Sequence, residues 1–84
     1  MNEIIDRFIQ LVELEHIKMP WLERQTGIKQ DRWHSIKKRK VMRTSELEAM
    51  YKICPEYQIW LATGFEVPEL GQISPMTKDK QTKK

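Results

Sequence analysis

The sequence predicts an all-α fold, a small bundle of five helices, and three observations lead to it. Apolar residues recur at helical spacing, first over the stretch Ile4–Val12. Pro20 and Pro55 stand where helices can begin, because the first helical position needs no N–H donor. Gly27 and Gly64 stand where helices end, because glycine accepts the left-handed backbone conformation.

Length and composition indicate a single soluble domain. Eighty-four residues form one small domain with a modest core. Hydrophobic residues make up 39% of the chain and charged residues 32%, a balance typical of folded proteins. No apolar run approaches the ~20 residues needed to span a bilayer. Glu3 and Asp6 interrupt the apolar pattern that a signal peptide would need.

The residues that could carry chemistry form no catalytic or metal-binding pattern. The single cysteine, Cys54, favours a reduced, cytoplasmic setting. It lies far from the two histidines along the chain, without the spacing of metal ligands. The sequence also has no phosphate-binding glycine loop and no nucleophile elbow. We therefore expect no enzyme activity, no metal and no cofactor, and no small-molecule effector is evident.

Residues 19–40 predict two short helices joined at a glycine. The first runs over Pro20–Thr26, and the second begins near Lys29 or Gln30. Trp33 and Ile36 lie three apart and form an apolar seam on the second helix. The polar and basic residues on its other face are Gln30, Asp31, His34, Ser35, Lys37 and Lys38. A helix with one apolar seam and one such face is suited to the major groove of DNA.

This stretch resembles the helix-turn-helix of lambda-repressor-like (Cro-type, XRE-family) DNA-binding proteins. That pattern has an apolar residue, then a glycine followed by an aliphatic residue, and apolar residues six and nine positions after the glycine. The matching residues here are Leu22, Gly27, Ile28, Trp33 and Ile36. Glu23 departs from the pattern, since the family prefers alanine where the two helices touch. The segment Trp60–Gly64 looks like the close of the fifth helix of that fold, so the resemblance covers residues 2–64.

The resemblance implies a transcriptional regulator of Cro size that occupies an operator in double-stranded DNA. It also implies a phage, prophage or mobile-element origin and a place in the bacterial cytoplasm, at the nucleoid. The positions carried over as base contacts are Gln30, Asp31, His34 and Ser35. The basic residues expected at phosphates are Lys29, Lys37, Lys38, Arg39, Lys40 and Arg43.

Positive charge is concentrated on the same stretch of sequence. Residues 29–43 contain seven basic residues and one acidic residue, whereas residues 1–28 and 44–71 are net acidic. This distribution is typical of a protein that binds a polyanion.

The same bundle could instead be a protein-interaction module, such as an antitoxin or an inhibitor that binds an acidic partner.

The segments around the two helices give further expectations. The first helix is expected to carry Arg7 on its solvent side. Lys40–Arg43 is predicted to form a basic loop, and Thr44 or Ser45 to cap the next helix. Trp21 can lie in the core or against the DNA backbone, and the core is favoured because tryptophan is mostly buried.

The last twenty residues have no helical period. After a DNA-binding domain over residues 1–64, we expect an apolar arm over residues 65–76 and a disordered lysine-rich tail over residues 77–84. Because one recognition helix covers few base pairs, helix-turn-helix proteins usually dimerise. The residues expected at or near the contact of a homodimer are Trp60, Phe65, Val67 and Leu70. In the alternative, the arm folds back over the first helix of a monomer.

Overall fold

Helices account for most of what the computed structural model describes, which is the backbone of residues 3–82 and the side chains of residues 3–78. The six α-helices in this part of the chain are α1 (Ile4–Leu14), α2 (Met19–Thr26), α3 (Gln30–Arg39), α4 (Thr44–Ile53), α5 (Gln58–Thr63) and α6 (Pro75–Thr82). Two short 3₁₀ helices are η1 (Pro55–Tyr57) and η2 (Pro68–Leu70). The prediction of an all-α fold is confirmed.

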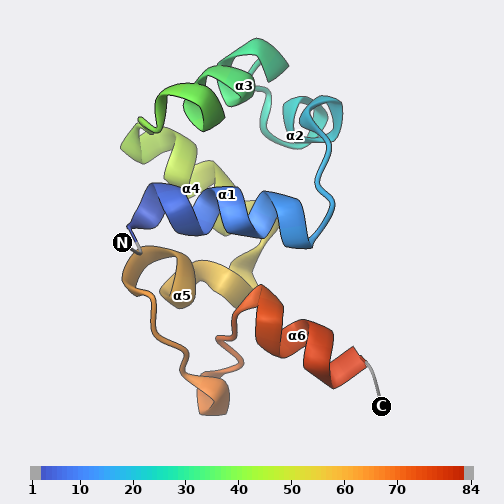
Figure 1. Ribbon diagram of the computed structural model, residues 1–84, viewed down its shortest axis with the longest axis vertical. Coiled ribbons are helices and arrows are strands. Elements are labelled where there is room, and N and C mark those ends of the chain that lie inside the picture. Colours follow the sequence, from blue (N-terminus) through green and yellow to red (C-terminus); the bar gives the residue numbers. More distant parts are fainter. Residues whose placement is uncertain (1–2, 83–84) are drawn as a thin grey trace.

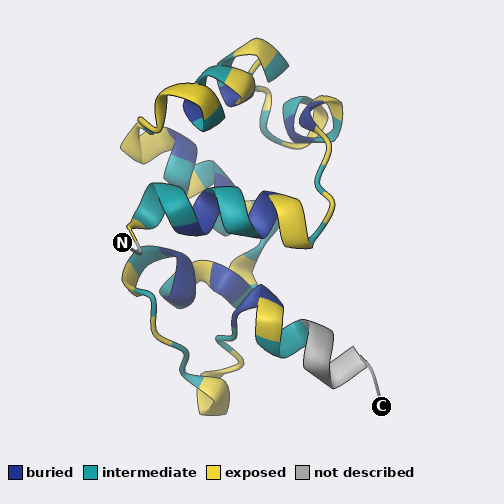
Figure 2. Cartoon of the chain, viewed as in Figure 1, coloured by how far each residue is buried: buried dark blue, intermediate teal, exposed yellow. Residues whose placement is uncertain are grey.

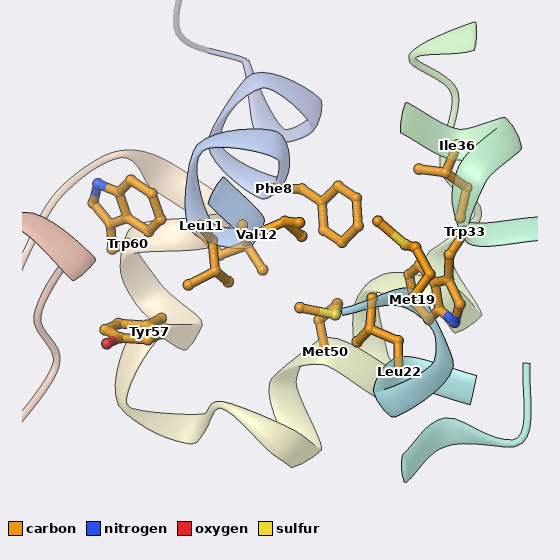
Figure 3. Packing of buried hydrophobic residues seen from close by; sticks show 11 residues of the cluster. Phe8, Leu11, Val12, Met19, Leu22, Trp33, Ile36, Met50, Tyr57 and Trp60 are labelled. Atoms are coloured by element: carbon orange, nitrogen blue, oxygen red, sulfur yellow. The ribbon is translucent and has the colours of Figure 1, made fainter. Parts of the chain in front are cut away.

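Helix α1 lies across the middle of the molecule, with the α2–α3 pair on one side and α5 and α6 on the other (Figure 1). Its apolar residues therefore meet neighbours on both sides. Phe8 points toward Trp33 and Met19, whereas Leu11 lies near Tyr57 (Figure 3). The core is accordingly continuous from α3, through α1, to η1 and α5.

The closest aromatic contact of this core joins the first helix to the third. The rings of Phe8 and Trp33 stack with centroids 5.6 Å apart and planes inclined by 22°. Both side chains are fully buried, as is Ile36 one turn further along α3. The predicted apolar seam of α3 is therefore confirmed, and it is the surface by which α3 is attached to the bundle.

Arg7 is buried rather than solvated, so the expectation that it lies on the wet side of α1 is wrong. Only 5% of the residue is exposed. Its Nε donates a hydrogen bond to the carbonyl of Leu61 at 2.9 Å, and its Nη2 donates to the carbonyl of Ala62 at 3.2 Å. These carbonyls lie near the C-terminal end of α5, where a cation also meets the negative end of the helix dipole.

The predicted helix ends are confirmed at both glycines. Gly27 ends α2 with φ of 77°, and Gly64 ends α5 with φ of 85°, both in the left-handed region. The predicted cap of α4 is wrong. Arg43 is the N-cap residue, and its N–H donates to the carboxylate of Glu46 at 2.7 Å. Neither Thr44 nor Ser45 occupies that position.

The expectation of a disordered tail from Thr77 is wrong as far as Thr82, because α6 extends to that residue. Ser74 precedes the helix, and its Oγ accepts a hydrogen bond from the N–H of Thr77 at 3.2 Å. Pro75 then occupies the first helical position, where a missing N–H has no cost. The remainder of the predicted tail, residues 83–84, lies outside the described residues.

The predicted arm folds back onto its own chain through Gln72 and Ile73. The Gln72 side chain donates to the carbonyl of Pro55 and accepts from the N–H of Ile59, each at 2.9 Å. The N–H of Ile73 donates to the carbonyl of Glu56 at 2.9 Å. Most of the arm therefore lies on η1 and α5, whereas its last two residues begin α6, the helix that packs against α1.

Replacing Trp33 with alanine should lower the free energy of unfolding by about 3–5 kcal/mol, because it empties a fully buried aromatic site. Urea denaturation followed by circular dichroism measures the loss. Trp21→Ala is the matched control, and it should cost less because Trp21 is only partly buried. Equal unfolding midpoints for Trp33→Ala and the unmodified protein would contradict the burial of Trp33.

Candidate nucleic-acid interface

Helices α2 and α3, with the turn at residues 27–29 between them, form a helix-turn-helix. In this pair α3 lies at the edge of the molecule (Figure 1). Its buried residues are Trp33 and Ile36, and much of its remaining surface is exposed (Figure 2). The helix is thus held by one seam and is open to a partner along the opposite side.

The four predicted base-contacting residues gather on the open side of α3. Asp31 and His34 are exposed, and Gln30 and Ser35 are partly exposed. Residues three and four apart in a helix are neighbours on its surface, so these side chains form one continuous polar strip. The structure therefore brings the predicted set together on a single face.

Five of the six predicted phosphate-contacting residues are exposed, and Lys37 is partly exposed. Four of the six lie along the end of α3 and at its cap, Arg43 follows in the loop, and Lys29 stands at the other end of the helix. Lys37 is 3.9 Å from the carboxylate of Glu13, and Lys40 is 3.9 Å from that of Asp6. Exposed ion pairs of this kind are worth little, so both lysines can exchange a carboxylate for a phosphate.

Glu23 caps α3, a role that sequence reasoning missed. Its Oε1 accepts a hydrogen bond from the N–H of Gln30, the first residue of α3, at 2.7 Å. A carboxylate at this position satisfies an otherwise unpaired N–H and faces the positive end of the helix dipole. This contact explains why a glutamate can stand at position 23, where lambda-repressor-like proteins prefer alanine.

Arg32 and Glu46 join α3 to α4 through a bidentate ion pair. The Nε and Nη2 of Arg32 donate to the two carboxylate oxygens of Glu46 at 2.5 and 2.9 Å. Glu46 is only 3% exposed. The hydrogen bond from Arg32 is the main cause that lowers the pKa of Glu46, and it also raises the pKa of Arg32. The pair holds α3 in place, so Arg32 has a structural role inside the basic stretch.

The residues predicted for a dimer contact lie in two different environments. Trp60 is 3% exposed and belongs to the core of its own chain, so its place at or near a dimer contact stays a prediction that relies on its neighbours for exposed surface. Phe65 and Leu70 remain 74% and 70% exposed, and Val67 is partly buried. Of the predicted contact residues, those that leave apolar surface exposed therefore lie in the loop around η2.

None of the helices in the described residues combines the length and the apolar character needed to cross a membrane. Histidine, cysteine, aspartate and glutamate residues in that part of the chain do not gather in any group of three or more that could hold a metal ion.

The fold and the open face of α3 define a small all-α helix-turn-helix protein. Neither a family model nor a curated protein matches the chain. Among solved structures, Pf6r from the filamentous phage Pf6 of Pseudomonas aeruginosa PA01 is 33% identical, with a TM-score of 0.78. The match covers 88% of this chain and 96% of that one. The chain therefore belongs to the same family as Pf6r.

This relationship confirms part of the resemblance inferred from the sequence. The relative is a phage protein, which is one of the origins that the resemblance implied. The coarse fold, a compact bundle of helices without strands in the described residues, is also confirmed. The narrower assignment to the XRE family has no matching family model and stays a prediction.

The stability of the protein should fall on acidification as Glu46 takes up a proton. The folded-state pKa of Glu46 lies below its ordinary value of 4.5. The stabilisation from its carboxylate is therefore complete above that value and is lost as the pH falls through the folded-state pKa. Urea unfolding between about pH 7 and about pH 3 measures this dependence.

The variant Glu46→Gln should be less stable near pH 7 and should lose less stability on acidification than the unmodified protein. Glu48→Gln, an exposed position on the same helix, is the matched control and should leave the pH dependence unchanged. Identical pH dependence in Glu46→Gln and the unmodified protein would show that the ion pair with Arg32 does not stabilise the fold.

Proposed function

We propose that this protein is a sequence-specific regulator of transcription that binds double-stranded DNA and acts by occupying an operator. The observation that carries the proposal is the way in which α3 packs against the bundle. Its apolar seam is fully buried, and its opposite face of polar and basic side chains is open. A helix presented in this way can enter the major groove, which is about 12 Å wide. The phage origin of Pf6r supports a phage or prophage setting for such a regulator.

The polar strip of α3 supplies groups that read base edges. Gln30 can pair bidentately with adenine, and Asp31 can accept a hydrogen bond from the amino group of cytosine. His34 and Ser35 continue the strip toward the basic end of the helix. The hydrogen bond from Gln30 to Glu23 and the ion pair of Arg32 with Glu46 fix the N-terminal turn of α3, which supports base reading because specific contacts need a rigid helix.

The basic residues around α3 supply contacts to the phosphate backbone. Lys38, Arg39, Lys40 and Arg43 are exposed at one end of the helix, and Lys29 is exposed at the other. A ten-residue helix is about 15 Å long, so the two sets can meet phosphates on either side of a groove. Contacts of this kind position a protein on DNA without reading its sequence.

We also propose that the DNA-binding form is a homodimer, formed through the loop around η2. Phe65 and Leu70 are the most exposed large apolar residues of the described chain. Apolar side chains left in water at neighbouring positions mark interfaces. Two recognition helices placed about 34 Å apart would then contact successive turns of DNA.

The salt dependence of binding to DNA distinguishes the proposed function from the alternative, a protein-interaction module. Binding to random duplex DNA that weakens steeply with salt reports contacts to phosphates. Absence of DNA binding at low salt would favour an acidic protein partner. Fluorescence anisotropy of a labelled duplex measures both outcomes.

Replacing Gln30 with alanine should weaken binding to the cognate operator by about 1–3 kcal/mol and change binding to random DNA little, as expected of a base contact. A footprint on DNA that flanks the gene would first identify the operator. Gln25→Ala, at an exposed glutamine of α2, is the control and should bind both duplexes normally. Equal losses on operator and random DNA would remove Gln30 from sequence reading.

Replacing both Lys37 and Lys38 with glutamine should weaken binding to every duplex. The slope of log affinity against log salt should fall by about two, because each lysine meets one phosphate. Lys52→Gln, an exposed lysine on α4, is the matched control for the loss of positive charge. A slope that is unchanged in the double variant would place both lysines outside the interface.

The double variant Phe65→Gln, Leu70→Gln should convert a dimer into a monomer without unfolding it. Substitution is a sharper test than truncation, because truncation after Gly64 would remove the hydrogen bonds of Gln72 to η1 and α5. Analytical sedimentation at about 100 μM detects association free energies near −5 kcal/mol or stronger. A full-length protein that sediments as a monomer at that concentration would rule out the proposed dimer.

A further inference from the structure

A cleft of about 680 Å³ opens on a side of the molecule that α3 does not line. Its walls come from the α1–α2 connection, from α2, from the end of α4 with η1, and from Lys78 of α6. This volume lies within the range of about 300–1,000 Å³ that is usual for small-molecule sites. This cleft could not be predicted from the sequence, because these segments are separated along the chain and meet only in the fold.

A buried hydroxyl without a hydrogen-bond partner lies in the wall of this cleft. Tyr57 is 1% exposed, and its Oη makes no hydrogen bond to any described residue. Such a group costs free energy unless something bonds to it. Burial, followed by the negative charge and the close approach of the Glu15 carboxylate, raises the pKa of Tyr57, so the hydroxyl keeps its proton and a ligand oxygen would have to compete with Glu15 for it. It is therefore available as a donor to an oxygen of a ligand.

A side chain that can move, that of Lys78, lies over the ring of Tyr57, with its Nζ 5.8 Å from the ring centroid. Its Nζ is 3.7 Å from the carboxylate of Glu15 and 3.5 Å from that of Glu56. Because all three side chains are at least about a quarter exposed, these pairs are weak, and Lys78 can be displaced at little cost.

The remaining wall combines apolar surface with unpaired positive charge. Trp21 and Ile53 are partly buried and present apolar surface. Burial raises the pKa of the Cys54 thiol to about 11, so this side chain is neutral as well. Lys18 and Arg24 line the cleft, are exposed, and form no ion pair with any described residue.

We propose that this cleft is a binding site for a small aromatic carboxylate. The aromatic ring would lie against Trp21, the carboxylate would meet Arg24 or Lys18, and a ligand oxygen would accept the hydrogen bond of Tyr57 once Lys78 has moved aside. The site does not involve α3, so it stands or falls independently of DNA binding. The role it offers is that of an effector site that α2 lines and α3 does not.

Nuclear magnetic resonance of the full chain, without DNA, tests the proposal through its three tryptophans. Phenylacetate and benzoate are titrated, with phenylacetamide and benzamide as uncharged counterparts. The indole N–H signal of Trp21 should shift saturably, whereas those of the buried Trp33 and Trp60 should stay in place. The carboxylates should bind at least about fivefold more tightly than the amides, because charge-assisted hydrogen bonds are roughly twice as strong.

Two variants separate binding from folding. Tyr57→Phe should weaken carboxylate binding about three- to tenfold while leaving the melting temperature unchanged or higher, since it removes an unpaired buried hydroxyl. Tyr51→Phe is the matched control and should bind normally, because Tyr51 does not line the cleft. Arg24→Gln and Lys18→Gln together, at exposed positions that should not disturb the fold, should abolish the preference for carboxylate over amide.

Several results would overturn the proposal. One is the absence of any saturable shift at Trp21 with either carboxylate up to about 10 mM, which is weaker than the usual range of ligand affinities. Another is equal affinity of carboxylate and amide in the unmodified protein. A third is unchanged affinity in a folded Tyr57→Phe variant.

Discussion

The position of α3 depends on the burial of Trp33. Most residues of this helix are polar, and Trp33 and Ile36 are its buried side chains. Stacking on Phe8 fixes the ring against α1, and aromatic pairs contribute beyond the apolar area they bury. The indole N–H of Trp33 makes no hydrogen bond to a described residue, so its burial costs free energy. The attachment of α3 through Trp33 therefore relies on apolar contacts alone. A face suited to DNA is therefore supported by a single stacked pair at the centre of the bundle.

Two carboxylates orient the helix around Trp33. Glu23 of α2 binds the N–H of Gln30, and Glu46 of α4 binds Arg32 in the first turns of α3. Rotation of α3 about Trp33 is thereby opposed from both neighbouring helices. The same two groups place negative charge near the start of α3, whereas its other end is entirely basic. The two ends of α3 consequently differ. Hydrogen bonds to neighbouring helices hold its N-terminal end, and its basic C-terminal end would attract an anionic partner.

Local features of this fold could be predicted from the sequence, and tertiary partners could not. Gly27 ended a helix where expected because a left-handed residue is a local requirement, and the seam through Trp33 followed from helical spacing. Arg7 was missed because its acceptors lie 54 and 55 residues away. Glu46 was missed because a buried glutamate is recognisable only beside its arginine. For the candidate site, spacing placed the polar strip on one face, but the pairing of Lys37 with an acid on α1 needed the folded chain.

The contact of Arg7 with the end of α5 bears on the order in which the chain can complete its fold during synthesis. Arg7 is synthesised early, as part of α1. Two of its hydrogen-bond acceptors, the carbonyls of Leu61 and Ala62, are synthesised more than fifty residues later. Until then, burial of this charge against α1 would lack those partners and would be costly. Helices α2 to α4 can therefore gather around Phe8 before the ribosome has finished, while the opposite side of α1 stays wet. The last helices close the bundle by supplying carbonyl acceptors to a charge that the first helix has carried from the start.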